Sequence, residues 1–290
     1  MAEDQNLTFW DHLEDLRWML LRSLVAVFVF AILGFIIMPF LYDKYVMGPT
    51  TSDFFLYKYL CIITSKIPFI PDFCDDNFHV EIVNINLASQ FFRHMSTSFW
   101  FAMILTFPYL VYEIWKFINP ALYANEKPKV RTAFLFGTGM FFVGCLLGYS
   151  VIFPVTFRFL ATYQLSPDIK NQISLDSYMD NFLMMIFIMG VMFELPLVSW
   201  LASKLGLINR IFFKKFRRHA VVILLVVAAF ITPSGDPFTL MVVFIPIYLL
   251  YELSYFLVEP GKPEEENEES DSENDDSTSD DDNGLSLDKI

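Results

Sequence analysis

The chain has 290 residues, of which 55% are hydrophobic and 18% are charged, and its formal net charge is -13. A soluble domain has about 45–50% apolar and about 25% charged residues, so a single soluble core is excluded. The acidity is confined to residues 259–290, which hold 14 acidic and 2 basic side chains, a net of -12, and leave -1 for residues 1–258. Such a nearly neutral body also argues against nucleic acid as a partner, because nucleic-acid binding calls for a basic surface.

Residues 1–17 are predicted to form a cytoplasmic N-terminal segment. They carry five acidic side chains and one arginine. This is the wrong charge for the basic start of a secretory signal peptide. We therefore expect the apolar stretch that follows to remain in the protein as its first membrane-spanning helix.

Six stretches are apolar enough to suggest membrane helices, each of which needs about 20 mostly apolar residues. Four have this length and two are short or interrupted; in chain order the six are residues 18–40, 96–118, 132–154, 178–202, 220–232 and 238–258. The sequence thus predicts an all-α polytopic membrane protein with six transmembrane helices in a domain over residues 18–258. The fifth is too short for a normal bilayer, so it must thin the membrane or lie beside a polar cavity.

The basic side chains predict how the helices are oriented. Lys and Arg are concentrated in the loops between the second and third and between the fourth and fifth predicted helices, whereas the long loop at about 41–90 has three Lys against six acids. Because Lys and Arg favour cytoplasmic loops, both termini are predicted to be cytoplasmic. Residues 259–290 have too few apolar side chains to fold and are expected to be a disordered cytoplasmic tail.

The external loop also holds two of the three cysteines, Cys61 and Cys74. Disulfides persist outside the cytoplasm, so these two residues could form a bridge. The alternative is two free thiols in a half-buried loop. Pro49 lies in the same loop, and the many aromatic residues around it favour an external cap and an interfacial belt.

Glu194 is an ionisable residue well inside the fourth predicted span. Such groups cost at least about 2.5–3.5 kcal/mol at mid-bilayer and so suggest a functional role, although a purely structural carboxyl group facing the bundle interior is the alternative. Pro196 follows two residues later, and Pro108 and Pro246 interrupt the second and sixth spans. Three prolines inside spans favour kinked helices around a concave face.

Two further patterns suggest helix packing and peptide binding. Gly144 and Gly148 form a GxxxG pattern in the third span, which we expect to serve internal helix packing. On the cytoplasmic side, residues 10–17 read as an amphipathic helix start with three acids, and with Glu126 they could present a pair of carboxylates to a cationic peptide, because guanidinium groups match carboxylates in bidentate pairs. The alternative is that these charges are simply solvated. The motifs of serine hydrolases, zinc proteases and P-loop enzymes are absent, and neither a cofactor nor a metal site is expected.

Five segments in order resemble the TatC family of the twin-arginine protein translocase. They are residues 12–17 (HLEDLR), Pro49, residues 107–127 (FPYLVYEIWKFINPALYANEK), residues 193–196 (FELP) and residues 232–252, which begin TPSGDP and end IPIYLLYE. The sequence departs from the family pattern at Asp15, where the family has Glu, and at Ser234 and Gly235, which replace a second proline. The external loop is longer than usual, and the acidic tail lies outside the resemblance.

The resemblance implies a glove-like six-helix fold in the bacterial inner (cytoplasmic) membrane and a non-enzymatic receptor for twin-arginine signal peptides. The partners implied are single-span TatA/TatB-type proteins and folded precursors, with export driven by the proton-motive force and with several copies of the chain possible in one complex. Glu126, Asp15 and Phe117 would bind the signal peptide, and the charges of Arg17, Lys127 and Glu14 lie beside them. Glu194 and Pro196 would face partners within the membrane.

Two other functions remain open on the residues alone. A proton-coupled small-solute transporter could use Glu194, but transporters of this kind usually show an internal repeat, and the two halves of this chain show no clear symmetry. An intramembrane enzyme would need a nucleophile and base, and no such pair is evident among the predicted spans.

Overall fold

A computed structural model describes residues 9–52, 54–64, 78–119, 127–166, 168, 171–204, 206–232 and 235–258. The first eight residues and the predicted tail at 259–290 lie outside the described residues. The described part is mainly long helices, as predicted, and five segments are long and apolar enough to cross a membrane. These segments are Leu13–Thr50, Ser89–Ile118, Val130–Thr162, Leu175–Lys204 and Pro237–Leu257.

Each predicted span corresponds to a helix or to two helices in line. The helices are α1 (Phe9–Leu41), α3 (Ser89–Ile118), α4 (Lys127–Leu147) with α5 (Phe153–Thr162), α6 (Leu175–Met192) with α7 (Leu195–Lys204), α8 (Arg210–Ile231) and α9 (Pro237–Leu257). The helix α1 begins nine residues before the predicted span at Trp18, so the second half of the predicted N-terminal segment is helical.

The predicted count of six spans is not fully confirmed, because α8 is not among the five candidates. The helix has 22 residues, but its first half carries Arg210, Lys214, Lys215, Arg217 and Arg218. Only the part from Ala220 onward is free of charge. At 1.5 Å per residue this part is about 18 Å long, well short of a hydrocarbon core of about 30 Å.

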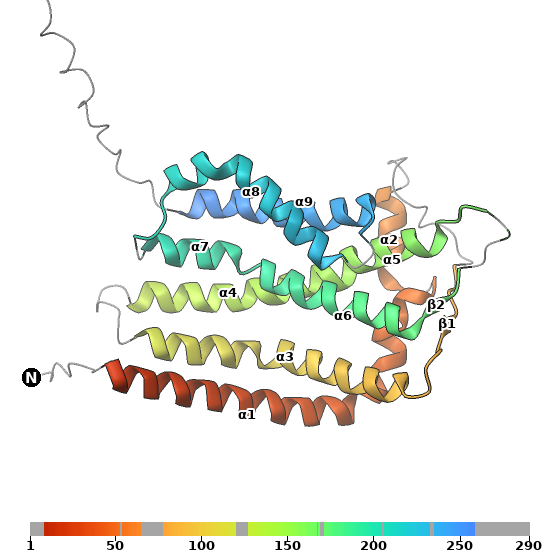
Figure 1. Cartoon of the computed structure of the whole chain (residues 1–290), viewed down its shortest axis with the longest axis horizontal. Helices are drawn as coiled ribbons and strands as arrows, with labels where there is room; N and C mark the ends of the chain where they lie inside the picture. The colour runs from red at the N-terminus through yellow and green to blue at the C-terminus, as the bar shows by residue number, and fades with distance from the viewer. Residues whose placement is uncertain are drawn as a thin grey trace, which may run out of the picture.

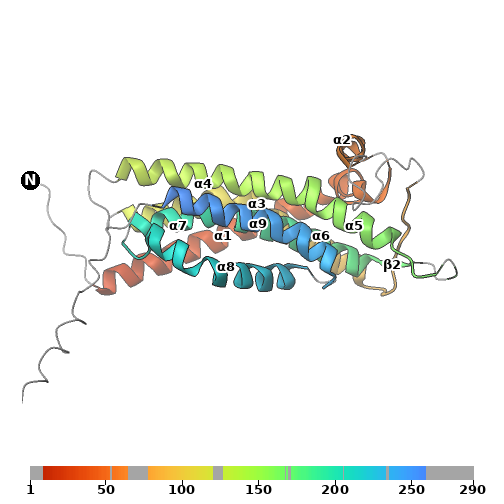
Figure 2. The ribbon, with the colours of Figure 1, turned by 90° about the horizontal axis from the view of Figure 1, so that it is seen from above.

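The long helices lie side by side along one axis, in the order α1, α3, α4, α6 with α7, α9 and α8 (Figure 1). In the perpendicular view, α4 and α5 run along one side of the bundle and α8 along the other (Figure 2). The predicted bending has visible causes. A turn at Phe193 and Glu194 separates α6 from α7, a π-helical segment (η4, Gly148–Ile152) joins α4 to α5, and Pro108 and Pro246 lie inside α3 and α9.

The core is built where α4 crosses α6. Met179, Met185 and Met189 of α6 are fully buried, and so is Phe141 of α4. A Cβ atom on Gly144 would lie 2.6 Å from the carbonyl oxygen of Met189, so only glycine allows the two backbones to come this close. The expected internal packing role of the GxxxG pattern is therefore confirmed.

A compact cap follows α1 at one end of the bundle. It comprises η1 (Tyr42–Val46), η2 (Gly48–Thr50), α2 (Phe55–Thr64) and β1 (Ile82–Val83). The strand β1 pairs in parallel with β2 (Ile173–Ser174), which precedes α6. The phenol of Tyr178 in α6 donates a hydrogen bond of 2.5 Å to the carbonyl of Val46. The long loop is thus anchored to the start of α6, and we refer to this end as the cap end.

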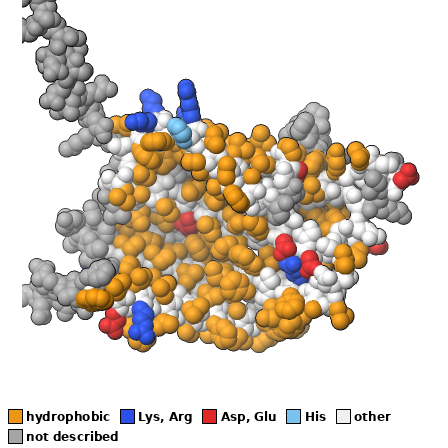
Figure 3. Space-filling view, in the orientation of Figure 1, with side chains coloured by type: hydrophobic (Ala, Val, Ile, Leu, Met, Phe, Trp, Pro, Cys, Tyr) orange, Lys and Arg blue, Asp and Glu red, His pale blue; other side chains and the backbone are white. Residues whose placement is uncertain are grey.

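The surface agrees with a membrane environment. Leu24 and Phe28 of α1 are about two-thirds exposed, at 67% and 66%, and Phe230 of α8 is 78% exposed. Figure 3 shows hydrophobic side chains over most of the face in view, with most of the charged side chains toward the two ends. An apolar surface of this extent would be unfavourable in water and is suited to lipid.

Candidate functional site

The two predicted binding carboxylates of α1 lie at the end opposite the cap, which we call the N-terminal end. Glu14, Asp15 and Arg17 are in the first turns of α1, and all three side chains are exposed. Exposed charges one to three positions apart on a helix are accessible from several directions. They are therefore available to a ligand that approaches this end of the bundle from water.

The other predicted residues of this site come from the junction of α3 and α4. Phe117 is partly buried in the last turn of α3, and Lys127 is the first residue of α4. Glu126 lies outside the described residues, directly before Lys127. The structure therefore brings Phe117 and Lys127 to the same end as Asp15, and the place of Glu126 stays a prediction.

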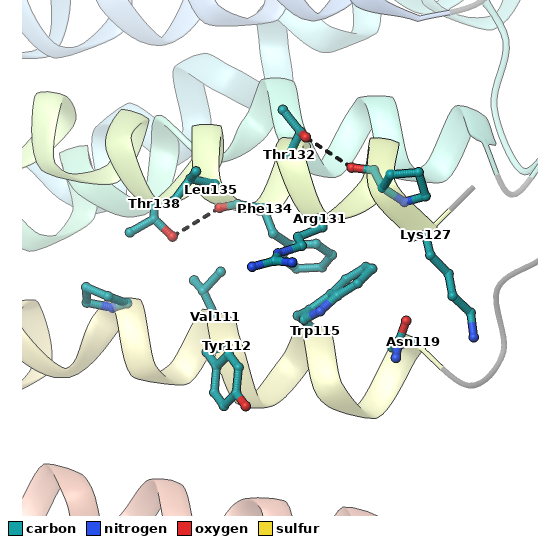
Figure 4. Close-up of a pocket in the computed structure, with 12 residues that line it drawn as sticks. Val111, Tyr112, Trp115, Asn119, Lys127, Arg131, Thr132, Phe134, Leu135 and Thr138 are labelled. Carbon is teal, nitrogen blue, oxygen red and sulfur yellow. Dashed lines mark hydrogen bonds between the residues drawn. The ribbon is translucent and has the colours of Figure 1, made fainter. Parts of the chain in front are cut away.

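A groove opens between α3 and α4 next to this junction. Its volume is about 1120 Å³. Figure 4 shows Trp115 extending from α3 toward α4 and Arg131 extending from α4 toward α3, while Tyr112 points away. The floor is apolar, because Val111, Val130 and Phe134 form a small buried cluster there. Apolar walls and a few polar groups at the mouth are usual for a ligand site.

A partly buried ion pair holds α1 against α3 below the N-terminal end. The side chain of Glu113 is only 4% exposed, and its Oε2 atom lies 3.1 Å from Nη2 of Arg22 in α1. Arg22 Nε also donates to this oxygen at 3.2 Å, and the phenol of Tyr109 donates to the other oxygen at 3.0 Å. This arrangement fixes the position of α1, and with it that of Asp15, relative to α3.

The sequence reasoning missed this pair. The signal was present, because a carboxylate inside a span is expected to have a partner at similar depth. The two residues are 91 positions apart in the sequence, and this distance hid the pairing.

Glu194 lies in the turn between α6 and α7, half-way along the bundle. The side chain is partly buried, and its Oε1 atom has no hydrogen-bond partner among the described residues. Its Oε2 atom lies 2.8 Å from the point where a Cβ on Gly137 would be, so α4 passes close by. Pro196 is buried in the first turn of α7. The break in the helix thus places a partly buried carboxyl group within the candidate membrane span, as the sequence suggested.

The predicted residues of the external loop lie in the cap, far from the N-terminal end. Pro49 is buried in η2, and its carbonyl accepts a hydrogen bond of 2.6 Å from the phenol of Tyr57. Burial raises the pKa of that phenol, and the guanidinium of Arg158 over the ring opposes the rise. Cys61 is in a disulfide, and its predicted partner Cys74 lies outside the described residues.

A second charged cluster joins α3 to α6 at the cap end. Arg93 Nε donates to Asp176 at 2.7 Å, and its two terminal nitrogens bind Asp180. Ser89 Oγ also donates to Asp176, at 2.8 Å. Asp176 and Asp180 thus hold the starts of two long helices together through Arg93.

Comparison with known proteins gives the family. The profile of "Sec-independent protein translocase protein (TatC)" matches residues 11–246. The chain is 34% identical to a TatC protein of Blattabacterium sp. subsp. Periplaneta americana over 260 residues, which cover 88% of this chain and 96% of that protein. It is 30% identical to TatC of Deinococcus radiodurans over 261 residues, which cover 89% and 88% of the two chains.

Two solved structures show the same fold. A crystal structure described as the twin arginine translocase receptor TatC is 26% identical, has a TM-score of 0.66 and covers 85% of this chain and 97% of its own. A second, in DDM, has a TM-score of 0.68 at 26% identity, and the match covers 86% of this chain and 99% of the other. The all-α polytopic fold and the resemblance are confirmed. The family is a component of a protein translocase, which favours a transport role over an intramembrane enzyme or a small-solute transporter. The chain belongs to the TatC family of Sec-independent protein translocase proteins and is a multi-pass membrane component of that translocase.

Proposed function

We propose that this protein is the receptor subunit that binds twin-arginine signal peptides of folded precursors on the cytoplasmic face of the bacterial inner membrane. Both termini would then be cytoplasmic, as the basic loops indicate. The structures of similar fold are described as twin arginine translocase receptors, which supports the assignment. The observation that carries it is the exposed acidic pair of Glu14 and Asp15 beside the junction of α3 and α4.

The chemistry of the ligand fits this end of the bundle. Two adjacent guanidinium groups need carboxylates that can accept bidentate hydrogen bonds, and Asp15 with Glu126 would supply them. Phe117 would contact the apolar part of the peptide. Arg17 and Lys127 would limit the net negative charge, so that lysine-rich segments without the correct geometry bind less well. The ion pair of Arg22 with Glu113 would keep α1 at a fixed distance from α3.

Glu194 would serve a later step. Its carboxyl group lies at the break between α6 and α7, and Pro196 has no backbone N–H to donate to the preceding turn. A single-span TatA- or TatB-type helix with a polar side chain at the same depth could bind at this point. The proposal thus separates peptide binding at the N-terminal end from partner binding at mid-membrane.

Site-specific crosslinking of a precursor tests the receptor role. Glu126→Lys and Asp15→Lys should each reduce crosslinking of a twin-arginine precursor at least tenfold, because each places a cation where the arginines would bind. Glu81→Lys is the matched control, since Glu81 is exposed at the cap end and undergoes the same change of charge. All three proteins should reach the membrane in equal amounts. Unchanged crosslinking in the Glu126 and Asp15 variants, or an equal loss in the Glu81 variant, would refute the site.

A further inference from the structure

We propose that the groove between α3 and α4 binds the headgroup and one acyl chain of an anionic phospholipid. The groove is distinct from the acidic pair of α1, and its occupant would be part of the membrane rather than a precursor. Its apolar floor lies within a candidate membrane span, and its mouth lies at the N-terminal end of the bundle, where the headgroups of one leaflet would be. A basic pocket between membrane helices at this depth is the usual form of an anionic lipid site.

The positive charge of the groove favours an anionic lipid over a cationic peptide as its ligand. Its charged lining residues are Lys127 and Arg131, which are four positions apart and therefore on one face of α4. No ion pair or hydrogen bond joins either side chain to another described residue. Two cations without a partner among the described residues would disfavour a twin-arginine segment inside the groove and would attract a phosphate, while Lys127, at the junction of α3 and α4, borders both sites. The N-terminal turn of α4 adds its partial positive charge at the same place.

The remaining polar groups of the groove also favour an anionic ligand. Thr132 and Thr138 donate their hydroxyl protons to carbonyls of their own helix, at 3.0 Å in both cases, as the dashed lines in Figure 4 show. Asn119 and the indole of Trp115 remain as donors beside the two cations. These donors lie beside Lys127 and Arg131, which give the described lining of the groove a positive charge. An anionic headgroup meets this set of donors.

The floor is suited to an acyl chain. Trp115 and Phe134 pack with ring centroids 5.7 Å apart, and Val111 and Phe134 are each only 8% exposed. Leu135 forms the outer edge and is 75% exposed, so the groove is open to the lipid phase along its side. A chain that enters from the bilayer would cover this apolar surface without leaving the membrane.

Quenching of tryptophan fluorescence by brominated lipids tests the proposal in the full-length protein. The chain has five tryptophans, and replacing Trp10, Trp18, Trp100 and Trp200 by phenylalanine leaves Trp115 as the reporter. The protein is reconstituted in phosphatidylcholine vesicles that contain a minor share of brominated phosphatidylglycerol or, in parallel, the same share of brominated phosphatidylcholine. We expect stronger quenching of Trp115 by the brominated phosphatidylglycerol.

Arg131 variants then assign the preference to the groove. Arg131→Gln should weaken the preference about fivefold, the effect of one cation near the headgroup. Arg131→Lys should retain it. Arg218→Gln is the matched control, because it removes one exposed cation from α8 at the same end of the bundle and should leave the preference unchanged. Circular dichroism of each variant checks that the helices have formed, and if Arg131→Gln does not fold, the comparison of the two lipids in the parent protein decides.

Five outcomes would overturn the proposal. The first three are equal quenching by the two lipids, an undiminished preference in Arg131→Gln and an equal loss in Arg218→Gln. The fourth is displacement of the lipid by inorganic phosphate alone, which would make the occupant a free anion. The fifth is displacement by a twin-arginine peptide, which would assign the groove to the precursor. None of these results depends on the crosslinking of precursors to Asp15 or Glu126, so the lipid site and the receptor role are tested separately.

Discussion

Replacing Arg22 by alanine should destabilise the protein more than replacing its partner Glu113 by glutamine. Arg22→Ala leaves the carboxylate of Glu113, which is 4% exposed, with the phenol of Tyr109 as its one described donor. Glu113→Gln leaves Arg22, whose side chain is 42% exposed and can extend toward the interface. Removing Arg22 should therefore lower the free energy of unfolding more than neutralising Glu113.

The magnitudes follow from burial. Breaking a fully buried pair costs about 3–5 kcal/mol, and the exposure of Arg22 reduces this to about 2–3 kcal/mol for Arg22→Ala. Glu113→Gln should cost about 1 kcal/mol, since the amide oxygen still accepts from Tyr109. The double variant should be more stable than Arg22→Ala alone, because the neutral amide no longer needs a counter-charge.

Equilibrium unfolding in mixed micelles of SDS and a mild detergent, followed by circular dichroism, measures these differences. Arg22→Lys is the control that keeps the charge but loses the fork geometry, and its cost should lie between those of the parent and Arg22→Ala. If the double variant loses as much unfolding free energy as the two single variants together, the reasoning is refuted. The two side chains would then act independently, without an interaction between them.

The remaining predictions concern packing and the other ion pairs, and the same unfolding assay measures them. Gly144→Val should destabilise the protein by about 1–3 kcal/mol, because the valine side chain would collide with the backbone of α6. Gly139→Ala is the control: a Cβ there has nothing within 4 Å, so the change should be neutral or stabilise by up to about 1 kcal/mol. Equal effects of the two variants would contradict the close approach of α4 and α6. Arg93→Gln should destabilise more than Glu252→Gln, because it removes a cation that two aspartates share. Glu252→Gln should cost less than about 1 kcal/mol, since its partner Arg217 is 53% exposed; a larger effect than that of Arg93→Gln would be inconsistent with the burial.

The long helices were predictable because each is a run of apolar residues longer than a bilayer requires. The break before α7 was also foreseeable, since Pro196 cannot donate its backbone to a continuing helix. The helical start before Trp18 was foreseeable too, because residues 10–17 have the pattern of an amphipathic helix start. The basic half of α8 was missed, because apolar composition identifies a span and α8 begins as a charged surface helix.

The cap and the candidate site were harder to predict from the sequence. The pairing of Ile82 with Ile173 involves strands of two residues, which are too short to show an alternating pattern. The groove depends on the side chains of Trp115 and Arg131 from different helices, and spacing along one helix cannot reveal it. Asp15 and Phe117 were identified only through their motifs, and the structure adds that both lie at one end of the bundle.

The parallel pairing of β1 with β2 also has a consequence for biogenesis. The two strands are 91 positions apart in register, from Ile82 to Ile173, and α3, α4 and α5 lie between them. A growing chain therefore synthesises the cap long before its partner strand exists. Until α6 begins, the cap lacks its pairing with β2, and Tyr178 adds the hydrogen bond to Val46 just afterwards. A nascent chain that ends before residue 173 would therefore present the cap without this anchor, and proteases on that side of the membrane could recognise incomplete molecules by it.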